Sequence, residues 1–273
     1  MPPSLQNSRC QPLKRRTFAL ALLCLSSSPA LVQAQPQPPA SITVSAAASL
    51  TNAFEEIAAA FEKSRPGVKV QLNFAASGPL LQQILQGAPV DVFASADSET
   101  MDRAAAAKVI APGSRADFAG NALVLVLPTL GKAGQLPAPS TLAGLAAPAF
   151  AKIAIGNPAT VPAGRYALQA INASSNPLAS ALQPRWIYAD SVRQALGYVV
   201  RGEVDAGFVY RSDALSEKSR VRVAFEMLMA IPVRYPIATV ARSKNPELAQ
   251  AFVNFVQTDA AQAILVRYGF DRL

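Results

Sequence analysis

Small and hydroxyl-bearing residues follow the first apolar segment of the sequence, at the point where a helical pattern begins. Residues 45–52 lie between a strand-like run at 42–44 and an amphipathic pattern with a 3.6-residue period. The first backbone N–H groups of such a helix have no partner within it, and the helix dipole is positive there. With the Ser49 hydroxyl beside them, these groups are suited to bind an anion. The alternative is that Ser49, Thr51 and Asn52 only cap the helix, which the general preference of these residue types for helix starts favours.

Three later junctions between strand and helix repeat this arrangement. Ser77 follows an alternating strand and precedes Pro79, which costs nothing in the first turn of a helix because its missing N–H would be unpaired there. A loop that ends at Gly164 leads into another helix, and Asp190 or Ser191 is a natural N-cap for a further one. The strands before these junctions are predicted at residues 68–72, 152–155 and 186–188.

Strands that alternate with helices predict an α/β fold with parallel sheets, whose ligand sites lie beyond the carboxyl ends of the strands. A Gly-, Pro- and Ala-rich connection through Pro148 indicates passage into a second lobe. We expect residues 41–121 and 234–273 to form lobe 1 and residues 122–233 to form lobe 2. Further strands are predicted at residues 90–94, 123–127, 204–209, 221–225 and 235–240, and two amphipathic helices close the chain.

The first 34 residues are typical of a secretory signal peptide. A basic segment precedes an apolar stretch at 18–25, which is too short to span a bilayer, and a small-x-small signal ends at Ala34. We therefore expect cleavage after Ala34, a flexible leader at 35–40 and a periplasmic protein. Two adjacent arginines leave the Sec and twin-arginine export routes both open. Leu23 before Cys24 does not fit a lipidation signal.

The residue types of the exported chain exclude several chemistries. Both cysteines, Cys10 and Cys24, lie in the signal peptide, and the chain has no histidine. A disulfide, a zinc or copper site on thiolate or imidazole, and a Ser-His-Asp triad are therefore excluded. Removal of the presequence lowers the formal net charge from +8 to +4. Because the remaining basic residues are scattered, we expect no nucleic-acid partner.

A secreted serine hydrolase is a remote alternative. Its nucleophile would be Ser49 or Ser77, and without histidine its general base would have to be a lysine or a carboxylate. No lysine lies at any of the four junctions. We therefore expect a binding protein and not an enzyme.

Six fragments of the sequence, in the same order, resemble those of the periplasmic molybdate-binding proteins of ABC-type importers, which are type II solute-binding proteins. The resemblance extends from Ile42 to Phe270. Each fragment alone is a weak signal, but six in the right order are specific. The fragments are residues 46–51, 87–97, 156–164, 190–193, 207–214 and 267–270.

The resemblance implies two α/β lobes, joined by two crossover strands, that close on one tetrahedral oxyanion held by neutral donors. It implies that the ligand is held by hydroxyl and backbone N–H groups of the first lobe, by backbone N–H groups of the second lobe and by one phenol. The only metal that the resemblance implies is that of molybdate or tungstate, which would be bound through its oxygens. The resemblance implies no cofactor. The implied partners are the membrane permease subunits of an importer, with the binding protein itself a monomer. The implied ligand-binding residues are Ser49, Ser77, Ala163, Val192 and Tyr210.

Two departures concern the surroundings of this site. Ala76 and Gly78 stand where relatives often carry hydroxyl residues. Arg165, Arg193 and Arg211 each adjoin an implied site residue and could add positive potential at the cleft. Adjacent helical residues point about 100° apart, which favours the alternative that these are solvated surface arginines.

Two further alternatives concern the ligand and the tyrosine. Tyr210 could contact the ligand, or it could belong to the core with its hydroxyl bonded to backbone. The same fold could also bind another oxyanion such as sulfate or phosphate, or an organic anion.

Overall fold

The computed structural model describes residues 40–174 and 176–273. The predicted signal peptide and most of the leader lie outside these residues, whereas Ala40, predicted to end the leader, begins a strand. Within the described part of the chain, none of the helices is long and apolar enough to cross a membrane.

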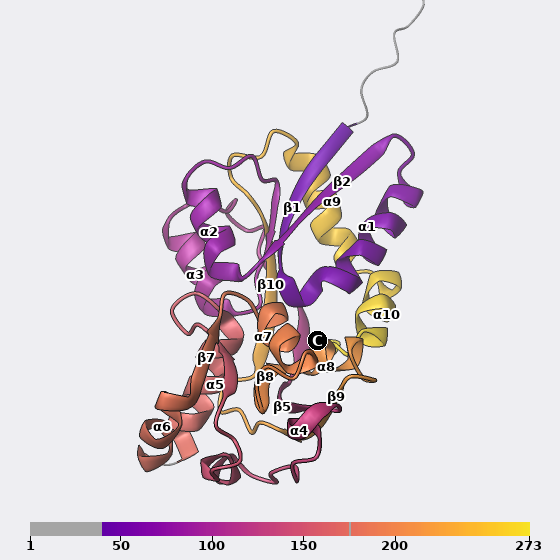
Figure 1. Cartoon of the computed structure of the whole chain (residues 1–273). Helices are drawn as coiled ribbons and strands as arrows, with labels where there is room; N and C mark the ends of the chain where they lie inside the picture. The colour runs from indigo at the N-terminus through magenta and orange to yellow at the C-terminus, as the bar shows by residue number, and fades with distance from the viewer. Residues whose placement is uncertain (1–39, 175) are drawn as a thin grey trace, which may run out of the picture. The chain divides into compact units, whose positions relative to one another are not determined.

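The first sheet has five strands, in the order β2 (Val68–Ala75), β1 (Ala40–Ala47), β3 (Val92–Ala94), β10 (Val233–Thr239) and β4 (Ala116–Asn121). β1 runs parallel to β2 and β3, and β10 runs antiparallel to β3 and β4. Figure 1 shows α1 (Thr51–Ser64), α9 (Pro246–Val256) and α10 (Asp259–Arg267) on one side of this sheet. The other side carries α2 (Ser77–Leu85) and α3 (Ser98–Ala106).

The second sheet has the order β7 (Trp186–Ala189), β6 (Ile153–Gly156), β8 (Ala206–Tyr210), β5 (Leu123–Pro128) and β9 (Val221–Glu226). Its parallel strands are β7, β6 and β8, and β5 runs antiparallel to β8 and β9. The associated helices are α4 (Gly131–Gly134), α5 (Pro162–Ser174), α6 (Asn176–Leu182), α7 (Val192–Val200) and α8 (Arg211–Ser216). Three short 3₁₀ helices are η1 (Ala48–Leu50), η2 (Leu142–Ala146) and η3 (Gln183–Arg185).

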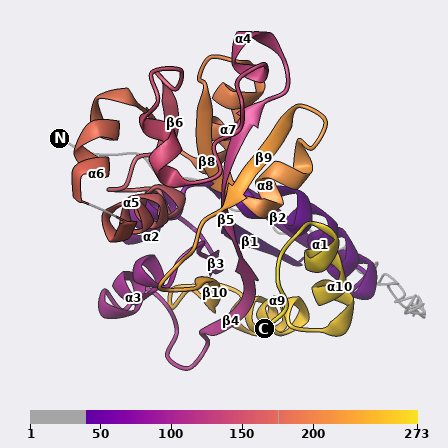
Figure 2. The ribbon, with the colours of Figure 1, turned by 90° about the horizontal axis from the view of Figure 1, so that it is seen from below.

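The α/β, two-lobe fold class is confirmed. The predicted parallel pairing holds for β1, β2 and β3 and for β6, β7 and β8, whereas the other strands pair antiparallel. The chain passes between the sheets twice, from β4 to β5 and from β9 to β10 (Figure 2). A strand that enters from the other sheet is not bound by the helical crossover that makes sequential strands parallel, and β5 and β10 both run antiparallel to their neighbours. β4 was not predicted, because its sequence, with an aspartate and a glycine, has no clear alternation.

Apolar residues of α1 hold the start of that helix in place. Phe54, Ile57 and Phe61 are fully buried, as the 3.6-residue period predicted. The ring of Phe61 packs edge-on against Phe252 of α9, with the centroids 5.2 Å apart. Full burial of each such side chain contributes about 1.5–3 kcal/mol. The η1 turn that precedes α1 and carries Ser49 is thereby anchored to the core of the first lobe.

Candidate functional site

The five predicted site residues line one small cavity. Ser49 lies in η1 after β1, Ser77 begins α2 after β2, Ala163 lies in the first turn of α5, Val192 begins α7, and Tyr210 ends β8. The cavity is narrow, and every residue that lines it is uncharged. The lining is completed by Ala47, Ala48, Ala76, Ala96, Val161 and Pro162.

The helix starts around this cavity supply backbone donors. Ser77 and Val192 are the first residues of their helices and Ala163 is the second residue of α5, so their N–H groups cannot be bonded within the helix. The positive ends of the helix dipoles meet there as well. The cavity is therefore suited to a small anion that accepts hydrogen bonds from several directions.

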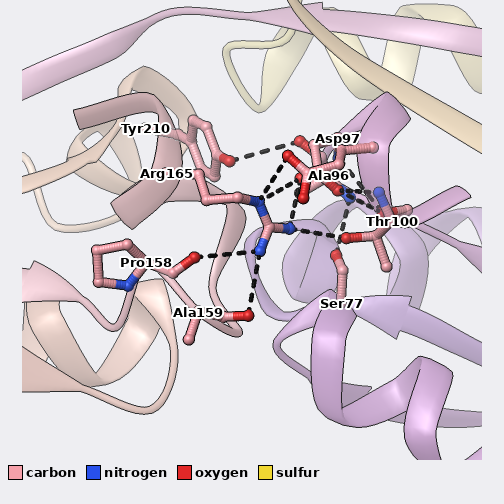
Figure 3. A network of polar contacts seen from close by, with 10 residues as sticks. Ser77, Ala96, Asp97, Thr100, Pro158, Ala159, Arg165 and Tyr210 are labelled. Atoms are coloured by element: carbon pink, nitrogen blue, oxygen red, sulfur yellow. Dashed lines mark hydrogen bonds and ion pairs between the residues drawn. The ribbon is translucent and has the colours of Figure 1, made fainter. Parts of the chain in front are cut away.

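The hydroxyl of Ser77 is held by the chain itself. Its side chain is fully buried, and its Oγ accepts a hydrogen bond from the backbone N–H of Ala96 at 3.0 Å (Figure 3). The oxygen thus has a protein donor, while the hydroxyl hydrogen needs an acceptor. An oxyanion in the cavity would supply one.

Ser49 is held by two residues that sequence reasoning missed. Its Oγ lies 2.9 Å from the hydroxyl oxygen of Tyr235, a fully buried residue of β10. Asn121, the last residue of β4, donates from Nδ2 to the same Tyr235 oxygen at 3.4 Å. Tyr235 lay in a predicted strand, but nothing distinguished it from an ordinary core aromatic, and no local signal marked Asn121.

The alternative that Ser49, Thr51 and Asn52 cap the first helix is wrong. Leu50 is the N-cap of α1, without a side-chain cap bond. Thr51 donates from its hydroxyl to the carbonyl of Ala48 at 2.7 Å, and Asn52 accepts from Arg193. The intervening 3₁₀ turn displaces these side chains from capping positions. By contrast Ser191, one of two predicted caps for α7, accepts from the N–H of Gln194 at 3.1 Å.

Tyr210 contributes a phenol at the cavity wall. Its ring lies edge-on to Tyr235 with centroids 5.7 Å apart, and its hydroxyl donates to the carbonyl of Ala96 at 3.5 Å. This distance is at the weak limit for a hydrogen bond. Burial raises the pKa of the Tyr210 phenol well above its usual value, so the hydroxyl keeps its hydrogen at neutral pH. The structure thus shows a backbone contact for Tyr210, and its contact with a ligand stays a prediction.

The three arginines beside the site all reach from the second lobe to the first. Arg165 pairs with Asp97 at 2.5 Å and donates to the Thr100 hydroxyl at 2.8 Å (Figure 3). Arg193 donates to Oδ1 of Asn52 at 2.7 Å. Its side chain is 25% exposed and that of Arg165 only 12%, so the interpretation as solvated surface arginines is wrong for both.

Arg211, the third arginine, is more exposed and reaches the C-terminal segment. Its guanidinium donates to the carbonyl of Gly269 at 3.2 Å and pairs with the carboxylate of Asp271. None of the three arginines lines the cavity. Each arginine follows a cavity-lining residue by one or two positions, and we call these arginines with their first-lobe partners the rim. The partners are Asp97, Thr100, Asn52, Gly269 and Asp271.

The carboxylate of Asp213 supports this rim from within the second lobe. Its Oδ1 lies 2.8 Å from Nε of Arg193, but the two atoms are not aligned for a hydrogen bond, so the contact is one of charge. Asp213 also accepts from the N–H of Tyr210 at 3.2 Å. Burial raises the pKa of Asp213 to about 6, against the opposing effect of the Arg193 charge.

Gly78 allows the backbones of the two lobes to meet. Its N–H donates to the carbonyl of Thr160 at 3.1 Å, and a Cβ at this position would lie 2.5 Å from that carbonyl oxygen. A side chain at position 78 would therefore force the lobes apart.

Comparisons with known proteins agree with this architecture. Residues 42–271 match the family model of the bacterial extracellular solute-binding proteins. The molybdate-binding protein ModA of Escherichia coli is 38% identical over 230 residues, covering 84% of this chain and 88% of that protein.

Solved structures of other binding proteins share the fold, and two of them are compared with this chain below. The periplasmic molybdate-binding protein of Azotobacter vinelandii superposes with a TM-score of 0.72 at 27% identity, covering 84% of this chain and 98% of that one. The sulfate-binding protein SubI of Mycobacterium tuberculosis H37Rv reaches 0.75 at 20% identity, covering 86% and 87%, which shows the fold alone. Since the family model spans most of the sequence, the chain belongs to the bacterial extracellular solute-binding proteins.

Proposed function

We propose that this protein binds molybdate, and tungstate with it, and delivers the oxyanion to an ABC importer. The observation that carries the proposal is a cavity lined only by uncharged residues, onto which helix starts from both lobes and two serine hydroxyls converge. Such a site offers donors to a dianion without a fixed positive charge. The proposed ligand-binding residues are Ser49, Ser77, Ala163, Val192 and Tyr210.

Relatives support molybdate over other oxyanions. A protein 38% identical over most of both chains is a molybdate-binding protein, whereas the sulfate-binding neighbour shares only the fold. Sulfate therefore remains the alternative ligand that the experiment must exclude.

The serine partners support binding and not hydrolysis. Ser49 meets a phenol and Ser77 meets a backbone N–H, and neither group is a general base at neutral pH. We propose that both serines are ligand donors without a catalytic role.

The cellular setting is part of the same proposal. A signal peptide cleaved after Ala34 would place a monomeric protein in the periplasm, where its closed form would meet the permease subunits of the importer. We also keep as proposals lobe 1 at residues 41–121 and 234–273 and lobe 2 at 122–233.

Calorimetric titration of the mature protein with molybdate, tungstate, sulfate and phosphate at neutral pH tests the ligand. We expect tight binding of molybdate and tungstate, and molybdate that stays bound in a hundredfold excess of sulfate. Displacement by that excess of sulfate would place the protein among general oxyanion binders and overturn the assignment.

A further inference from the structure

We propose that Asn121 and Tyr235 are positioning residues that direct the Ser49 hydroxyl hydrogen into the cavity, and that they thereby set a preference for fully deprotonated oxyanions over protonated ones. The inference rests on the proposed function and names the specificity of its site. It concerns two residues that belong to the strands joining the lobes, β4 and β10.

The direction of the chain of hydrogen bonds begins at Asn121. Its Oδ1 accepts from the backbone N–H of Ala122 at 2.9 Å, and a backbone N–H can only donate. The amide orientation is thereby set, and Nδ2 must face the opposite way. From there it donates to Ser212 at 2.9 Å and to Tyr235 at 3.4 Å.

Tyr235 passes the direction on. Its oxygen is already an acceptor for Asn121, and Ser49 Oγ lies 2.9 Å away as an acceptor for the phenol hydrogen. The partners of the Tyr235 hydroxyl are Ser49 and Asn121, and Asn121 can only donate to it. If Ser49 donated as well, the hydrogen of this fully buried hydroxyl would have no acceptor among these partners, and an unpaired buried donor lowers stability. Burial also raises the pKa of this phenol well above its usual value, so it keeps its hydrogen.

The Ser49 hydroxyl thus accepts a hydrogen bond from Tyr235 and can donate its own hydrogen toward the cavity. Ser77 has the same polarity, because its Oγ accepts from the N–H of Ala96 (Figure 3). Successive hydrogen bonds in such a chain polarise one another and strengthen the terminal donor. Two serines from different strand ends therefore each present a hydroxyl hydrogen to the ligand.

The polarity of both serines determines which ligands fit. Molybdate at neutral pH carries no proton and accepts from every direction. Hydrogen phosphate brings a hydroxyl hydrogen that would face donors, and a buried donor without an acceptor costs affinity. Without the Tyr235 hydroxyl, Ser49 could turn a lone pair to that hydrogen.

The test measures the ratio of the phosphate and molybdate dissociation constants for wild type and for Tyr235→Phe in the full mature protein. We expect the variant to bind molybdate about 2- to 10-fold more weakly, the range for one neutral hydrogen bond. We expect the ratio of phosphate to molybdate Kd to fall by about fivefold, and the rise of phosphate affinity with pH to flatten. Sulfate, which has no proton, should weaken in parallel with molybdate.

Asn121→Asp provides a sharper variant because it keeps the shape and reverses the polarity. The carboxylate still accepts from Ala122 but now also accepts from Tyr235, so Ser49 must donate to Tyr235 and turn lone pairs to the ligand. The double variant, Asn121→Asp with Tyr235→Phe, has the same added charge but lacks the hydrogen bonds that link position 121 to Ser49. The loss caused by Asn121→Asp should be larger in the wild-type background than in Tyr235→Phe, by about fivefold or more.

Tyr166→Phe is the matched control, since Tyr166 is a buried tyrosine whose hydroxyl lies outside this chain of bonds. Its Kd ratio should stay within about twofold of wild type, and thermal melts without ligand show that each variant folds. An unchanged ratio in Tyr235→Phe, with both affinities equally weakened, would overturn the assignment and leave the proposed function intact. Wild-type protein that bound no oxyanion would overturn both.

Discussion

Arg165, Arg193 and Arg211 each follow a cavity residue within two positions, yet all three guanidinium groups lie on the rim and none lines the cavity. The cavity offers only neutral donors, whereas the rim contains ion pairs and charged hydrogen bonds between the lobes. Residues that are neighbours in the sequence thus form two regions, one of neutral donors and one of charged groups.

This difference has a physical basis. A guanidinium inside the cavity would attract any anion, protonated or not, and would carry a desolvation cost whenever the site closed empty. Neutral N–H and O–H groups have fixed directions and so distinguish ligands by their acceptors. Charge on the rim acts instead between the lobes, where we expect it to favour a closed form without contacting the ligand. Substitutions in the cavity and on the rim should therefore differ in what they change.

Gly78→Val tests whether the backbones of the two lobes must meet. Its Cβ would lie 2.5 Å from the Thr160 carbonyl oxygen, so we expect molybdate affinity to fall by about 30- to 150-fold, from an overpacking cost of about 2 to 3 kcal/mol. Calorimetric titration measures this change. Ala105→Val, on an exposed position of α3, is the control and should bind like wild type. Wild-type affinity in Gly78→Val would show that the lobes need not meet there.

Ser49→Ala and Ser77→Ala test the cavity directly. Each removes a hydroxyl donor to a charged ligand, and we expect a loss of about 1.5 to 3 kcal/mol in binding. The unliganded fold should also lose about 1 kcal/mol or more, because Tyr235 or the N–H of Ala96 is left without its buried partner. Ser64→Ala, at the end of α1, is the control. Affinities within twofold of wild type for both variants would remove these serines from the site.

Asp213→Asn tests whether the buried carboxylate beside Arg193 makes stability depend on pH. Burial raises the pKa of Asp213 in the folded state to about 6, above its ordinary value of 3.8. The folded state then binds more protons than the unfolded state between about pH 4 and pH 6, so this group's contribution to stability falls as pH rises through that range. The loss in the free energy of unfolding over this range is on the order of 2 kcal/mol.

Urea denaturation of wild type and Asp213→Asn across this range isolates the contribution, since the other carboxylates are common to both proteins. We expect the wild type, relative to the variant, to lose stability as pH rises. The opposite slope would mean that the Arg193 charge outweighs burial and keeps Asp213 ionised below its ordinary pKa.

Asp97→Asn and Arg165→Met test the rim at its least exposed ion pair. Asparagine keeps the cap that Asp97 provides for the N–H of Thr100, so the variant removes charge without removing the start of α3. The pair is largely buried, and we expect its loss to lower molybdate affinity by about 1 kcal/mol, or roughly fivefold. In scattering, saturating molybdate should shrink the radius of gyration of wild type more completely than that of the variants.

Arg201→Met is the matched control, because Arg201 pairs with Glu203 within the second lobe and on the surface. Its affinity and radius of gyration should equal those of wild type. If Arg165→Met behaved like this control, the rim ion pair would have no part in closure.

Local patterns predicted most of the fold and the strand-to-helix turns that surround the cavity. The 3.6-residue period found α1, and small residues at strand ends marked the turns that carry Ser49, Ser77 and Ala163. They could not predict β4, whose pairing with β10 is decided by a strand more than a hundred residues later. They also led to the wrong capping role for residues 49–52, because a 3₁₀ turn shifts those side chains.

Helix starts and strand ends are local features, so the amino-acid sequence alone predicts which backbone segments end in donors. The residue that each side chain contacts depends on the folded arrangement of distant segments. Ser49 contacts Tyr235 across 186 positions of sequence, and Arg193 contacts Asn52 across 141. Hydrogen-bond direction and ion pairing depend on distances of about 3 Å between such partners, and no local pattern contains that information.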